Sequence, residues 1–391
     1  MVEVGEARST LEIKPPVVIL SGIRWDFLWQ RHQILATLFA RAGYPTIFIE
    51  TTGLANPRSD LATAVKVVRR ILRAVGKGRK APDSALSNLT VYSPLVAPPT
   101  WKTLRRLNRA VFVPSVTRNL QHLLNGASPV VIAYPPTQTT LDILSGLKPR
   151  LIMYDCSENY DGFPGVPRDI ASTERELLER ADLVSCTSAF LLKKVRSLRP
   201  EAFLSGPGAD YDHFAVLQGS GKLDSRIRTV CFFGHLSEER VNFPILAGLA
   251  EKGFQIRLVG SIGRMDEGFF ATPGVEYWGE VSHVDLPAAL TGTDAFVIPY
   301  KVNTLTWGIS PAKIYECLAT GLPIVATPLP ELRRFEGHVY LAEGTEGFAE
   351  VLWRLPRLET GERVRARIEL ARANSWEARF EVIENEIRRK L

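Results

Sequence analysis

Long hydrophobic runs are absent from this sequence. Its 391 residues contain no stretch of about twenty consecutive apolar side chains, the length that a helix needs to cross a bilayer. The first residues, MVEVGEARSTLEIKPP, are polar and partly acidic, and they lack the apolar core of a secretory signal peptide. We therefore expect a cytoplasmic chain. It could still associate peripherally with the inner face of the membrane.

Cysteine is also scarce. The chain has four cysteines, at positions 156, 186, 231 and 317, and none lies in a C-x-x-C pair. This spacing argues against a disulfide framework and against a zinc site. Since 45% of the residues are apolar and 23% are charged, we expect a globular protein of two or three domains with reduced, mostly buried thiols.

Two phosphate-binding motifs are missing. The first predicted strand–helix turn lacks G-x-G-x-x-G, and G-x-x-x-x-G-K-[ST] occurs nowhere in the chain. These glycine-rich loops hold the phosphates of dinucleotides and of nucleoside triphosphates. Their absence argues against an NAD-dependent enzyme and against a nucleoside triphosphatase.

Acidic residues are rare between positions 58 and 109. This segment has 12 Lys and Arg against two Asp, a balance of +10, so the rest of the chain carries −4 of the formal +6. Within residues 61–80, the apolar and basic spacing predicts a basic amphipathic helix. Such a helix can bind an anionic membrane surface, or it can pack on its own domain. No helix-turn-helix pattern accompanies the charge, so nucleic-acid binding is not expected.

Hydrophobic periodicity predicts alternating strands and helices in the first half of the chain. Residues 17–49 read as a strand, a helix and a second strand. A helix over residues 172–181 is expected between the last two of three further strands, predicted at 130–133, 150–154 and 183–187. Such repeats build a parallel sheet covered by helices.

A second series of strands follows the polar stretch LQGSGKLDS at residues 217–225. Strands are predicted at 230–233, 255–259, 275–278, 295–299 and 324–326. We therefore predict an α/β protein with two doubly wound, Rossmann-like domains and a ligand cleft between the carboxyl ends of their sheets. The last residues, SWEARFEVIENEIRRKL, predict an amphipathic helix that braces the first domain.

A short helix in the second half carries a lysine in its first turn. In GISPAKIYECLATGLPIVATPLPE, Ser310 is the expected N-cap and Pro311 opens the helix. Lys313 lies where a helix start disfavours a cation unless an anion is bound there. Glu316 follows on the same face. The pair could hold the diphosphate and the ribose of a nucleotide, or it could be a solvated ion pair.

Glycines end two strands of the second series. CFFGHL places Gly234 and His235 after one strand, and LVGSIG places Gly260 after the next. Glycine lets the backbone approach a ligand closely at these positions. These residues are therefore candidates for ligand binding.

Carboxylates crowd the end of one strand in the first half. MYDCSENYDGFPG contains Asp155, Glu158 and Asp161. A carboxylate there could act as general base towards an acceptor hydroxyl, or it could cap the turn that follows.

The stretch SGIRWDFLWQRH supplies further polar candidates. Arg24 and Arg31 could meet an anionic group of an acceptor. Asp26 could take part in the same site, or it could cap a helix that begins at Phe27.

These stretches together resemble one family. GISPAKIYECLATGLPIVATPLPEL, the preceding GVEYWGEVSHVDLPAALTGTDAFVIPY and the closing SWEAR helix look like the nucleotide-sugar half of GT-B glycosyltransferases of the cell-wall and exopolysaccharide group, of the glycosyl transferases group 1 type. RWDFLWQRHQILATLFARAGY and MYDCSENYDGF resemble the acceptor half. The resemblance implies an acceptor-binding domain over 1–205, a nucleotide-sugar-binding domain over 206–372, and a helix over 373–391 that packs back on the first domain.

The resemblance also implies roles for single residues. Lys313 matches the residue that meets the donor diphosphate, and Glu316 matches the one that holds the ribose. Gly234 matches the glycine of the first loop of the donor domain, and the turn from Gly279 lines the base pocket. Glu158 falls where related bacterial transferases place a catalytic Asp.

The implied activity is transfer of a hexose-type sugar from a nucleoside diphosphate to a cell-surface glycan or lipid-linked precursor. No cofactor or metal is expected, because the D-x-D at 210–212 lies in the interdomain segment. Retaining members of the family commonly carry Glu where this chain has Gly308. The stereochemical course at the anomeric carbon therefore stays open between retention and an inverting displacement with Glu158 or Asp155 as base. A nucleotide-sugar epimerase of the same fold and a non-catalytic binding or scaffold protein remain alternatives.

Overall fold

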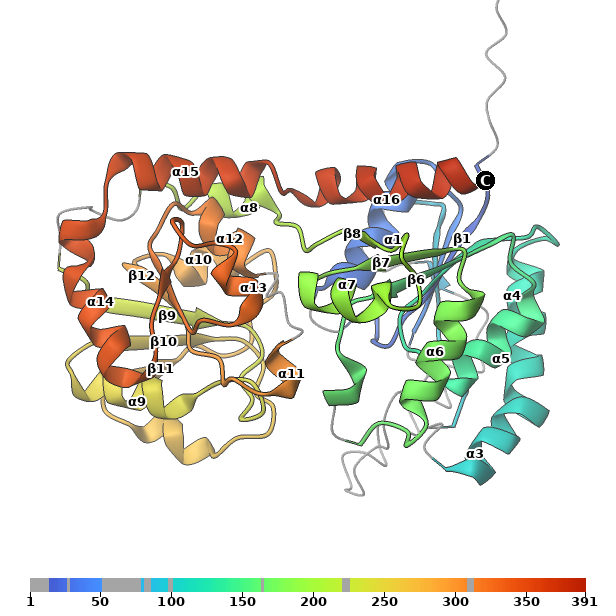
Figure 1. Cartoon of the computed structure of the whole chain (residues 1–391), viewed down its shortest axis with the longest axis horizontal. Coiled ribbons are helices and arrows are strands. Elements are labelled where there is room, and N and C mark those ends of the chain that lie inside the picture. Colours follow the sequence, from blue (N-terminus) through green and yellow to red (C-terminus); the bar gives the residue numbers. More distant parts are fainter. Residues whose placement is uncertain are drawn as a thin grey trace, which may run out of the picture. The chain divides into compact units, whose positions relative to one another are not determined.

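The chain divides into two compact units, residues 1–153 and 154–391. The computed structural model (Figure 1) describes residues 14–26, 29–50, 79–80, 86–97, 101–162, 165–219, 226–307 and 313–391. The domain boundaries expected after residues 205 and 372 stay predictions.

The first sheet has eight strands in the order β3-β4-β2-β1-β5-β6-β7-β8. Its strands are β1 Val17–Leu20, β2 Thr46–Ile49, β3 Arg79–Lys80, β4 Leu89–Tyr92, β5 Val130–Ala133, β6 Leu151–Cys156, β7 Leu183–Cys186 and β8 Phe203–Leu204. The central strands β1 and β5 are fully buried runs of Val, Ile, Leu and Ala, as expected for parallel strands covered on both faces. The predicted strands of the first half are thus confirmed, and the short β3 pairs antiparallel to β4.

Helices connect these strands. They are α1 Arg31–Arg41, α3 Lys102–Leu107, α4 Val113–Leu123, α5 Gln138–Leu147, α6 Ile170–Arg180 and α7 Ala189–Arg196, with a π-helical turn η1 Asn108–Phe112 and a 3-10 turn η2 Tyr160–Gly162. One of the two roles considered for Asp26, the cap of a helix that begins at Phe27, is wrong. Asp26 lies in a turn and α1 begins at Arg31, where the backbone N–H of Gln30 donates to Gln33 Oε1 at 3.2 Å. Asp26 therefore does not cap this helix.

The second sheet is parallel throughout the pairs described, in the order β11-β10-β9-β12-β13-β14. Its strands are β9 Thr229–Phe233, β10 Gln255–Val259, β11 Val275–Tyr277, β12 Ala295–Ile298, β13 Ile324–Ala326 and β14 Tyr340–Leu341. Figure 1 shows β12, β9, β10 and β11 side by side. All five strands predicted for this half are confirmed, and β14 is an addition.

The helices of the second half complete this α/β unit. They are α8 Tyr211–Ala215, α9 Phe243–Glu251, α10 Leu286–Leu290, α11 Thr304–Trp307, α12 Lys313–Ala319, α13 Pro330–Arg333, α14 Gly344–Leu358, α15 Gly361–Arg372 and α16 Trp376–Lys390, with a 3-10 turn η3 Glu267–Ala271. Helix α12 packs against α8 and α15, whereas α9 packs against α14. The closing helix α16 starts at the cap Ser375, whose hydroxyl accepts from the N–H of Ala378 at 3.2 Å, and it contacts β7.

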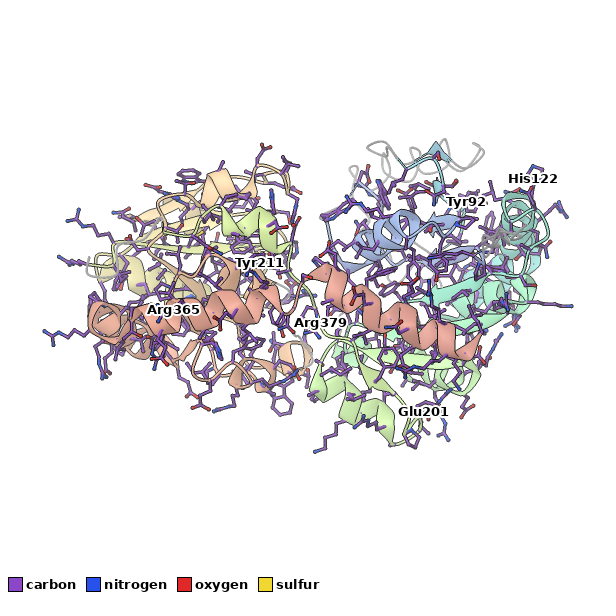
Figure 2. All side chains as sticks on the ribbon, turned by 90° about the horizontal axis from the view of Figure 1, so that it is seen from above. Tyr92, His122, Glu201, Tyr211, Arg365 and Arg379 are labelled. Atoms are coloured by element: carbon purple, nitrogen blue, oxygen red, sulfur yellow. The ribbon has the colours of Figure 1, made fainter. Side chains whose placement is uncertain are left out.

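Two segments far apart in the sequence pair where α8 and α16 begin. The N–H of Ala209 donates to Asn374 O at 3.0 Å, and the N–H of Trp376 donates to Ala209 O at 3.1 Å. Arg379, which Figure 2 labels on α16, donates from Nε to Pro207 O at 3.0 Å. Residues 207–209 and 374–379 are thus tied together by main-chain and side-chain bonds.

Strand order identifies where each sheet would bind a ligand. In the first sheet the chain leaves β1 in one direction for β2 and β4, and later places β5 on the other side of β1. In the second sheet β9 is flanked in the same way by β10 and β12. Ligands of doubly wound sheets bind outside the carboxyl ends of the strands at such switch points.

Two further expectations can be checked across the described residues. None of the helices in these ranges is long and apolar enough to cross a membrane. All four cysteines are buried and free of disulfides in the structure, which confirms the prediction that the thiols are buried.

Candidate functional site

Three glycines end three neighbouring strands of the second sheet. Gly234 follows β9 with a φ of +121°, Gly260 follows β10 with +135°, and Gly279 follows β11 after one intervening residue with +82°. The N–H of Gly234 donates to Val259 O, and the N–H of Gly260 donates to Gly279 O, each at 2.8 Å. A Cβ on Gly260 would lie only 2.8 Å from the carbonyl carbon of Gly234. The three turns therefore form a narrow, side-chain-free shelf at the carboxyl edge of the sheet.

Lys313 extends from α12 to this shelf. Its ammonium donates a hydrogen bond to the backbone oxygen of Phe233, the last residue of β9. It also lies 3.9 Å from the ring centroid of Phe232, a favourable cation–π distance. A Cβ on Gly234 would be 2.5 Å from Lys313 Nζ. The cation therefore occupies the switch point of the second sheet, beside its first glycine turn.

Glu316 is partly buried one turn further along α12. Burial raises the pKa of its carboxyl to about 7, with Lys313 opposing this rise and Asp210 adding to it. Near neutral pH the group can therefore exist in both forms. The ionised form can accept hydrogen bonds from two hydroxyl groups, as a ribose diol requires.

His235 joins the loops that follow β9 and β10. Its Nδ1 lies 3.0 Å from Ser261 Oγ, and a Cβ on Gly263 would be 2.5 Å from its Nε2. Burial lowers the pKa of His235, and the charges of Arg240 and Lys313 lower it further against an opposing effect of Glu239. The imidazole is therefore neutral at physiological pH and can accept as well as donate a hydrogen bond.

Glu158 lies in the loop after β6 and faces Arg240. Its Oε1 is 3.9 Å from Arg240 Nη2, and the two side chains are 32% and 27% exposed. Burial raises the pKa of Glu158 while the arginine opposes that rise. Asn159 fixes the loop, because its side-chain N–H donates to Thr304 O at 3.1 Å. Arg240 was not singled out from the sequence; its only signal was a charged residue six positions after Gly234.

Asp155 and Asp161 differ from Glu158 in their surroundings. Asp155 is fully buried and accepts a hydrogen bond from Ser185 Oγ at 2.5 Å. Asp161 is 46% exposed and pairs with Lys194 Nζ at 2.8 Å. A fully buried carboxylate that joins two strands is poorly placed to meet a substrate, so Glu158 is the stronger candidate base.

The structure places two of the three candidate acceptor-binding residues next to each other. Arg24 Nε lies 3.2 Å from Asp26 Oδ1, and both side chains are exposed. Arg31 is buried in the first turn of α1, at 7% exposure. The first two can contact a ligand at the surface, whereas Arg31 cannot do so without movement.

Sequence reasoning missed a polar cluster at the switch point of the first sheet. His32 stacks on Tyr134 with ring centroids 3.5 Å apart, and its Nδ1 lies 2.8 Å from Ser21 Oγ. Ser21 follows β1 and Tyr134 follows β5. Glu50, directly after β2, accepts from the N–H of Trp25 at 2.9 Å. The positions of these polar residues next to buried strands were the signal that could have found them.

Three predicted features lie wholly or mostly outside the described residues. Gly308 and Ser310 belong to the segment 308–312, and residues 61–78 of the predicted basic helix are also outside the described residues. The last two residues of that prediction, Arg79 and Lys80, form the strand β3, so the helix does not extend to residue 80. Helix α12 is described from Lys313 onward, and it ends before Gly321 as predicted. For the described residues, no cluster of three or more His, Cys, Asp or Glu could hold a metal ion; the expectation of a metal-free site stays a prediction.

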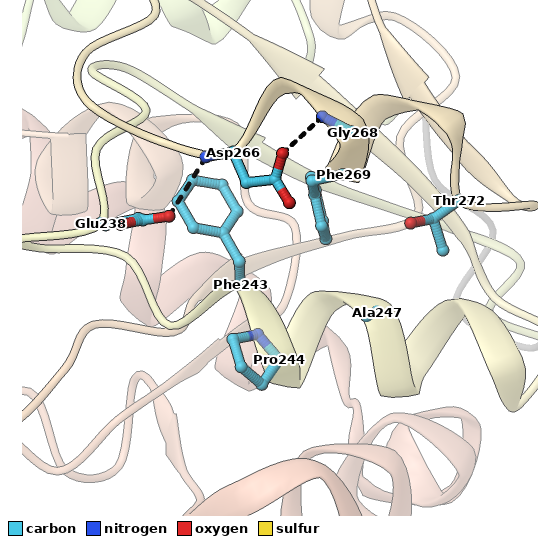
Figure 3. Close-up of a pocket in the computed structure, with 8 residues that line it drawn as sticks. All are labelled: Glu238, Phe243, Pro244, Ala247, Asp266, Gly268, Phe269 and Thr272. Carbon is cyan, nitrogen blue, oxygen red and sulfur yellow. Dashed lines mark hydrogen bonds between the residues drawn. The ribbon is translucent and has the colours of Figure 1, made fainter.

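A separate pocket of 370 Å³ opens beside α9 and the 3-10 turn η3 (Figure 3). Its lining includes the carboxylates Glu238 and Asp266 and the rings of Phe243 and Phe269. Glu238 Oε1 accepts from the N–H of Asp266 at 3.1 Å. None of the candidate donor-binding residues lines this pocket.

Comparisons with known proteins agree with this geometry. Residues 228–356 match the family model described as Glycosyl transferases group 1. The segment that is similar to this family model includes Gly234, Lys313 and Glu316.

The whole chain shares its fold with solved GT-B structures. Sucrose-phosphate synthase from Thermosynechococcus elongatus matches with a TM-score of 0.66 and 14% identity, over 96% of this chain and 99% of that one. Anabaena HepE, solved with UDP-glucose, matches with a TM-score of 0.65 and 12% identity, over 95% and 99% of the two chains. The predicted fold, two Rossmann-like sheets of GT-B type, is confirmed.

One similar sequence comes from Bacillus subtilis (strain 168). It is named as the teichuronic acid biosynthesis glycosyltransferase TuaH. The match is 24% identical over 224 aligned residues, and it covers 50% of this chain and 55% of that protein. The present chain therefore spans about half the length of this curated relative.

Proposed function

We propose that this protein is a glycosyltransferase that moves a sugar from a nucleoside diphosphate to a hydroxyl of a cell-surface glycan or lipid-linked precursor. The observation that carries the proposal is the ammonium of Lys313 at the carboxyl end of β9, within the segment that matches group 1 glycosyltransferases. A fixed cation beside a shelf of glycines suits a diphosphate, whose oxygens need both charge and close backbone approach.

The other donor contacts follow from the same shelf. Glu316 would accept hydrogen bonds from the ribose hydroxyls, and the turn at Gly279 would border the base. His235, neutral and next to Ser261, could contact the diphosphate or the sugar. Lys313 would stabilise the charge that grows on the leaving diphosphate, so we propose a reaction that needs no metal ion.

Glu158 is the proposed base for an inverting transfer. It would take the proton of the acceptor hydroxyl while the acceptor oxygen bonds to the anomeric carbon and the bond to the diphosphate breaks. Its raised pKa suits this task. We expect Glu158→Gln to lower kcat at least about a hundredfold while donor affinity stays the same, and Asp161→Asn, a matched exposed carboxylate, to retain activity. Full turnover by Glu158→Gln would exclude this base and favour a retaining route.

The acceptor assignment rests on the similarity to the teichuronic acid protein. We propose a cell-wall polysaccharide or its lipid-linked precursor as acceptor and a hexose-type sugar as the transferred group. Arg24 and Asp26, exposed beside β1, are the proposed acceptor contacts. Such an acceptor would be met at the cytoplasmic face of the membrane, and the basic residues 61–80 are proposed to help hold the protein there.

A panel of UDP-, GDP- and dTDP-sugars tests the proposal. We expect one donor class to raise the melting temperature and to release nucleoside diphosphate when acceptor is added, with EDTA having no effect. Lys313→Met should weaken donor binding about 10- to 100-fold, the value of one charge-assisted hydrogen bond. Lys252→Met is the control, because Lys252 also lies over an aromatic ring, 5.9 Å from that of Trp353. No response to any donor would reject the function, and donor conversion without acceptor would indicate an epimerase.

A further inference from the structure

One long helix of the first unit has an unusual surface. The helix runs without interruption through α3, η1 and α4, from Lys102 to Leu123, and Figure 1 shows α3 leading into α4. Residues 84–141 contain no Asp or Glu, and all five of their basic residues lie on this helix: Lys102, Arg105, Arg106, Arg109 and Arg118. Arg109 pairs with Asp142 of α5 at 2.9 Å, and no acidic residue of the helix itself neutralises the other four charges.

Asn108 fixes which side of this helix faces outward. It is fully buried, its side-chain N–H donates to Ala97 O, and its Oδ1 accepts from the N–H of Ala97, each at 2.8 Å. The same amide also donates to Thr139 Oγ1 at 3.1 Å. With this residue held against α5 and the 86–97 segment, the helix cannot rotate to hide its opposite side.

The outward side is apolar as well as basic. Trp101, at the N-cap, is 64% exposed, Leu107 is 41% exposed and Val111 is 53% exposed. Lys102 and Arg106 are exposed between them. Single exposed apolar residues are ordinary, but a tryptophan and two aliphatic residues spaced along one basic helix form an amphipathic interfacial pattern.

We propose that this helix face, defined by Trp101, Lys102, Arg106, Leu107 and Val111, docks on an anionic lipid surface. The basic groups would meet lipid phosphates while the tryptophan and the aliphatic side chains enter the interfacial region. A soluble polyanion would account for the charges but not for the exposed apolar groups. This face is separate from residues 61–80, and its docking does not depend on the chain being a glycosyltransferase.

Sedimentation with lipid vesicles tests the proposal. The full-length protein, without donor, is mixed with vesicles of phosphatidylcholine alone or of phosphatidylcholine with phosphatidylglycerol. We expect binding to the anionic vesicles only, and its loss in about 0.5 M NaCl, where charges are screened within a few ångströms. The variant Trp101→Ala/Leu107→Ser/Val111→Ser should bind at least about tenfold more weakly, and so should Lys102→Glu/Arg106→Glu.

Matched variants on the second unit serve as controls. Trp353→Ala/Val284→Ser removes two residues that are 51% and 78% exposed, and Arg333→Glu/Arg365→Glu makes the same change in net charge at exposed positions. Both should bind the vesicles as the wild type does. Hydrogen exchange of the wild type should show vesicle-induced protection in residues 101–112, which requires no mutation.

Each contrary outcome would overturn the proposal. Equal binding to neutral vesicles would remove the role of charge. Unchanged vesicle binding by both helix variants would assign the interaction elsewhere, including residues 61–80. If only Lys102→Glu/Arg106→Glu lost vesicle binding, and the wild type bound soluble heparin as tightly as anionic vesicles, the face would be a site for soluble polyanions. Donor-induced thermal stabilisation, measured separately, reports on the proposed function and is independent of these results.

Discussion

At the scale of single residues, Gly234 links backbone geometry to the charge of Lys313. Its φ of +121° is a conformation that other residues adopt only with strain. We expect Gly234→Ala to lower the free energy of unfolding by about 1–3 kcal/mol. The new Cβ would also displace the lysine ammonium, which is the flexible end of its side chain, so donor affinity should fall as well.

Gly253→Ala is the matched control for this substitution. Gly253 has a φ of +89°, but a Cβ there would meet nothing within 4 Å. Urea unfolding should show a similar loss of stability for both variants, whereas calorimetry should show weaker donor binding only for Gly234→Ala. Equal donor affinity in the two variants would mean that the shelf at Gly234 is not used by the donor.

The pKa of Glu316 is raised to about 7, so the proposed role of this residue predicts donor binding that depends on pH. If the ionised form accepts from both ribose hydroxyls, donor affinity should rise as pH increases through about 7 and level off above it. Glu316→Gln should bind more weakly at high pH and lose this dependence. A nucleotide-sugar is the correct titrant, since its diphosphate has no terminal phosphate that titrates near neutrality. A pH-independent wild-type affinity would contradict the role of Glu316.

The same group affects the stability of the empty protein. The folded state holds the proton of Glu316 more tightly than the unfolded state, whose carboxyl titrates near 4.5. The contribution of this group to the free energy of unfolding is therefore largest below pH 4.5 and decreases as pH rises towards 7. Thermal unfolding of wild type and Glu316→Gln across this window measures the difference.

The sequence could indicate residue types at the candidate site but not every contact. Lys313, Glu316 and the strand-end glycines were predictable as candidates, because each stands at a recognisable distance from a strand or helix end. Arg240 was not, since its pairing with Glu158 depends on where two loops meet that are far apart in the sequence. His32 and Tyr134 were missed for the same reason, because their stacking needs the folded β1–β5 pair.

At the scale of secondary structure elements, a buried ion pair holds α15 to the loop after α12. Arg367 is fully buried, pairs with Glu359, and donates from Nε to Gly321 O at 3.0 Å. Tyr340 also donates to Glu359 at 2.8 Å. We expect Arg367→Met to destabilise the protein by about 3–5 kcal/mol, because Glu359 would be left buried without its cation.

Urea unfolding with a surface control checks this prediction. Arg354 forms an exposed ion pair with Glu350 at 3.2 Å. The substitution Arg354→Met should therefore lower the free energy of unfolding by less than about 1 kcal/mol. The double variant Arg367→Met/Glu359→Gln should recover part of the loss, since it removes the unpaired charge. A loss no greater than that of Arg354→Met would show that the buried pair contributes little.

Strands were more predictable than helix starts. Contiguous Val, Ile and Phe residues identify β1, β2, β5 and β9 within a residue of their ends, because buried parallel strands are apolar on both faces. The sequence left open whether a helix begins at Phe27, whereas α1 begins at Arg31, next to Gln30, whose N–H donates to Gln33 Oε1. The π-helical turn η1 begins at Asn108, whose side chain bonds to Ala97 and Thr139, contacts that the sequence does not reveal.

At the scale of the whole molecule, the repeated βα pattern was sufficient to predict the fold, because each half independently specifies a doubly wound sheet. The functional division of the chain can be tested by hydrogen exchange with and without a saturating donor. We expect protection to concentrate within residues 206–372, above all at the strand ends after β9 and β10 and in α12. Strands β1, β2 and β4 should show little change.

The same experiment contains its own control. Residues 376–390 of α16 lie outside the proposed donor domain and should exchange at an unchanged rate. Protection spread evenly along the chain, or confined to residues 14–150, would contradict a donor domain at 206–372. Hydrogen exchange therefore tests the position of the donor domain, whereas donor turnover tests the activity.

The hydrogen bond between Lys313 and Phe233 has a consequence for selectivity in a cell rich in phosphate. An incoming anion must first compete with a carbonyl oxygen and an aromatic face that already solvate the ammonium. A small inorganic ion brings only its own charge to that competition. A nucleotide-sugar would add the proposed ribose contact of Glu316 and the proposed fit along the glycine shelf. Under the proposed function, the lysine would therefore favour an anion that binds by more than charge.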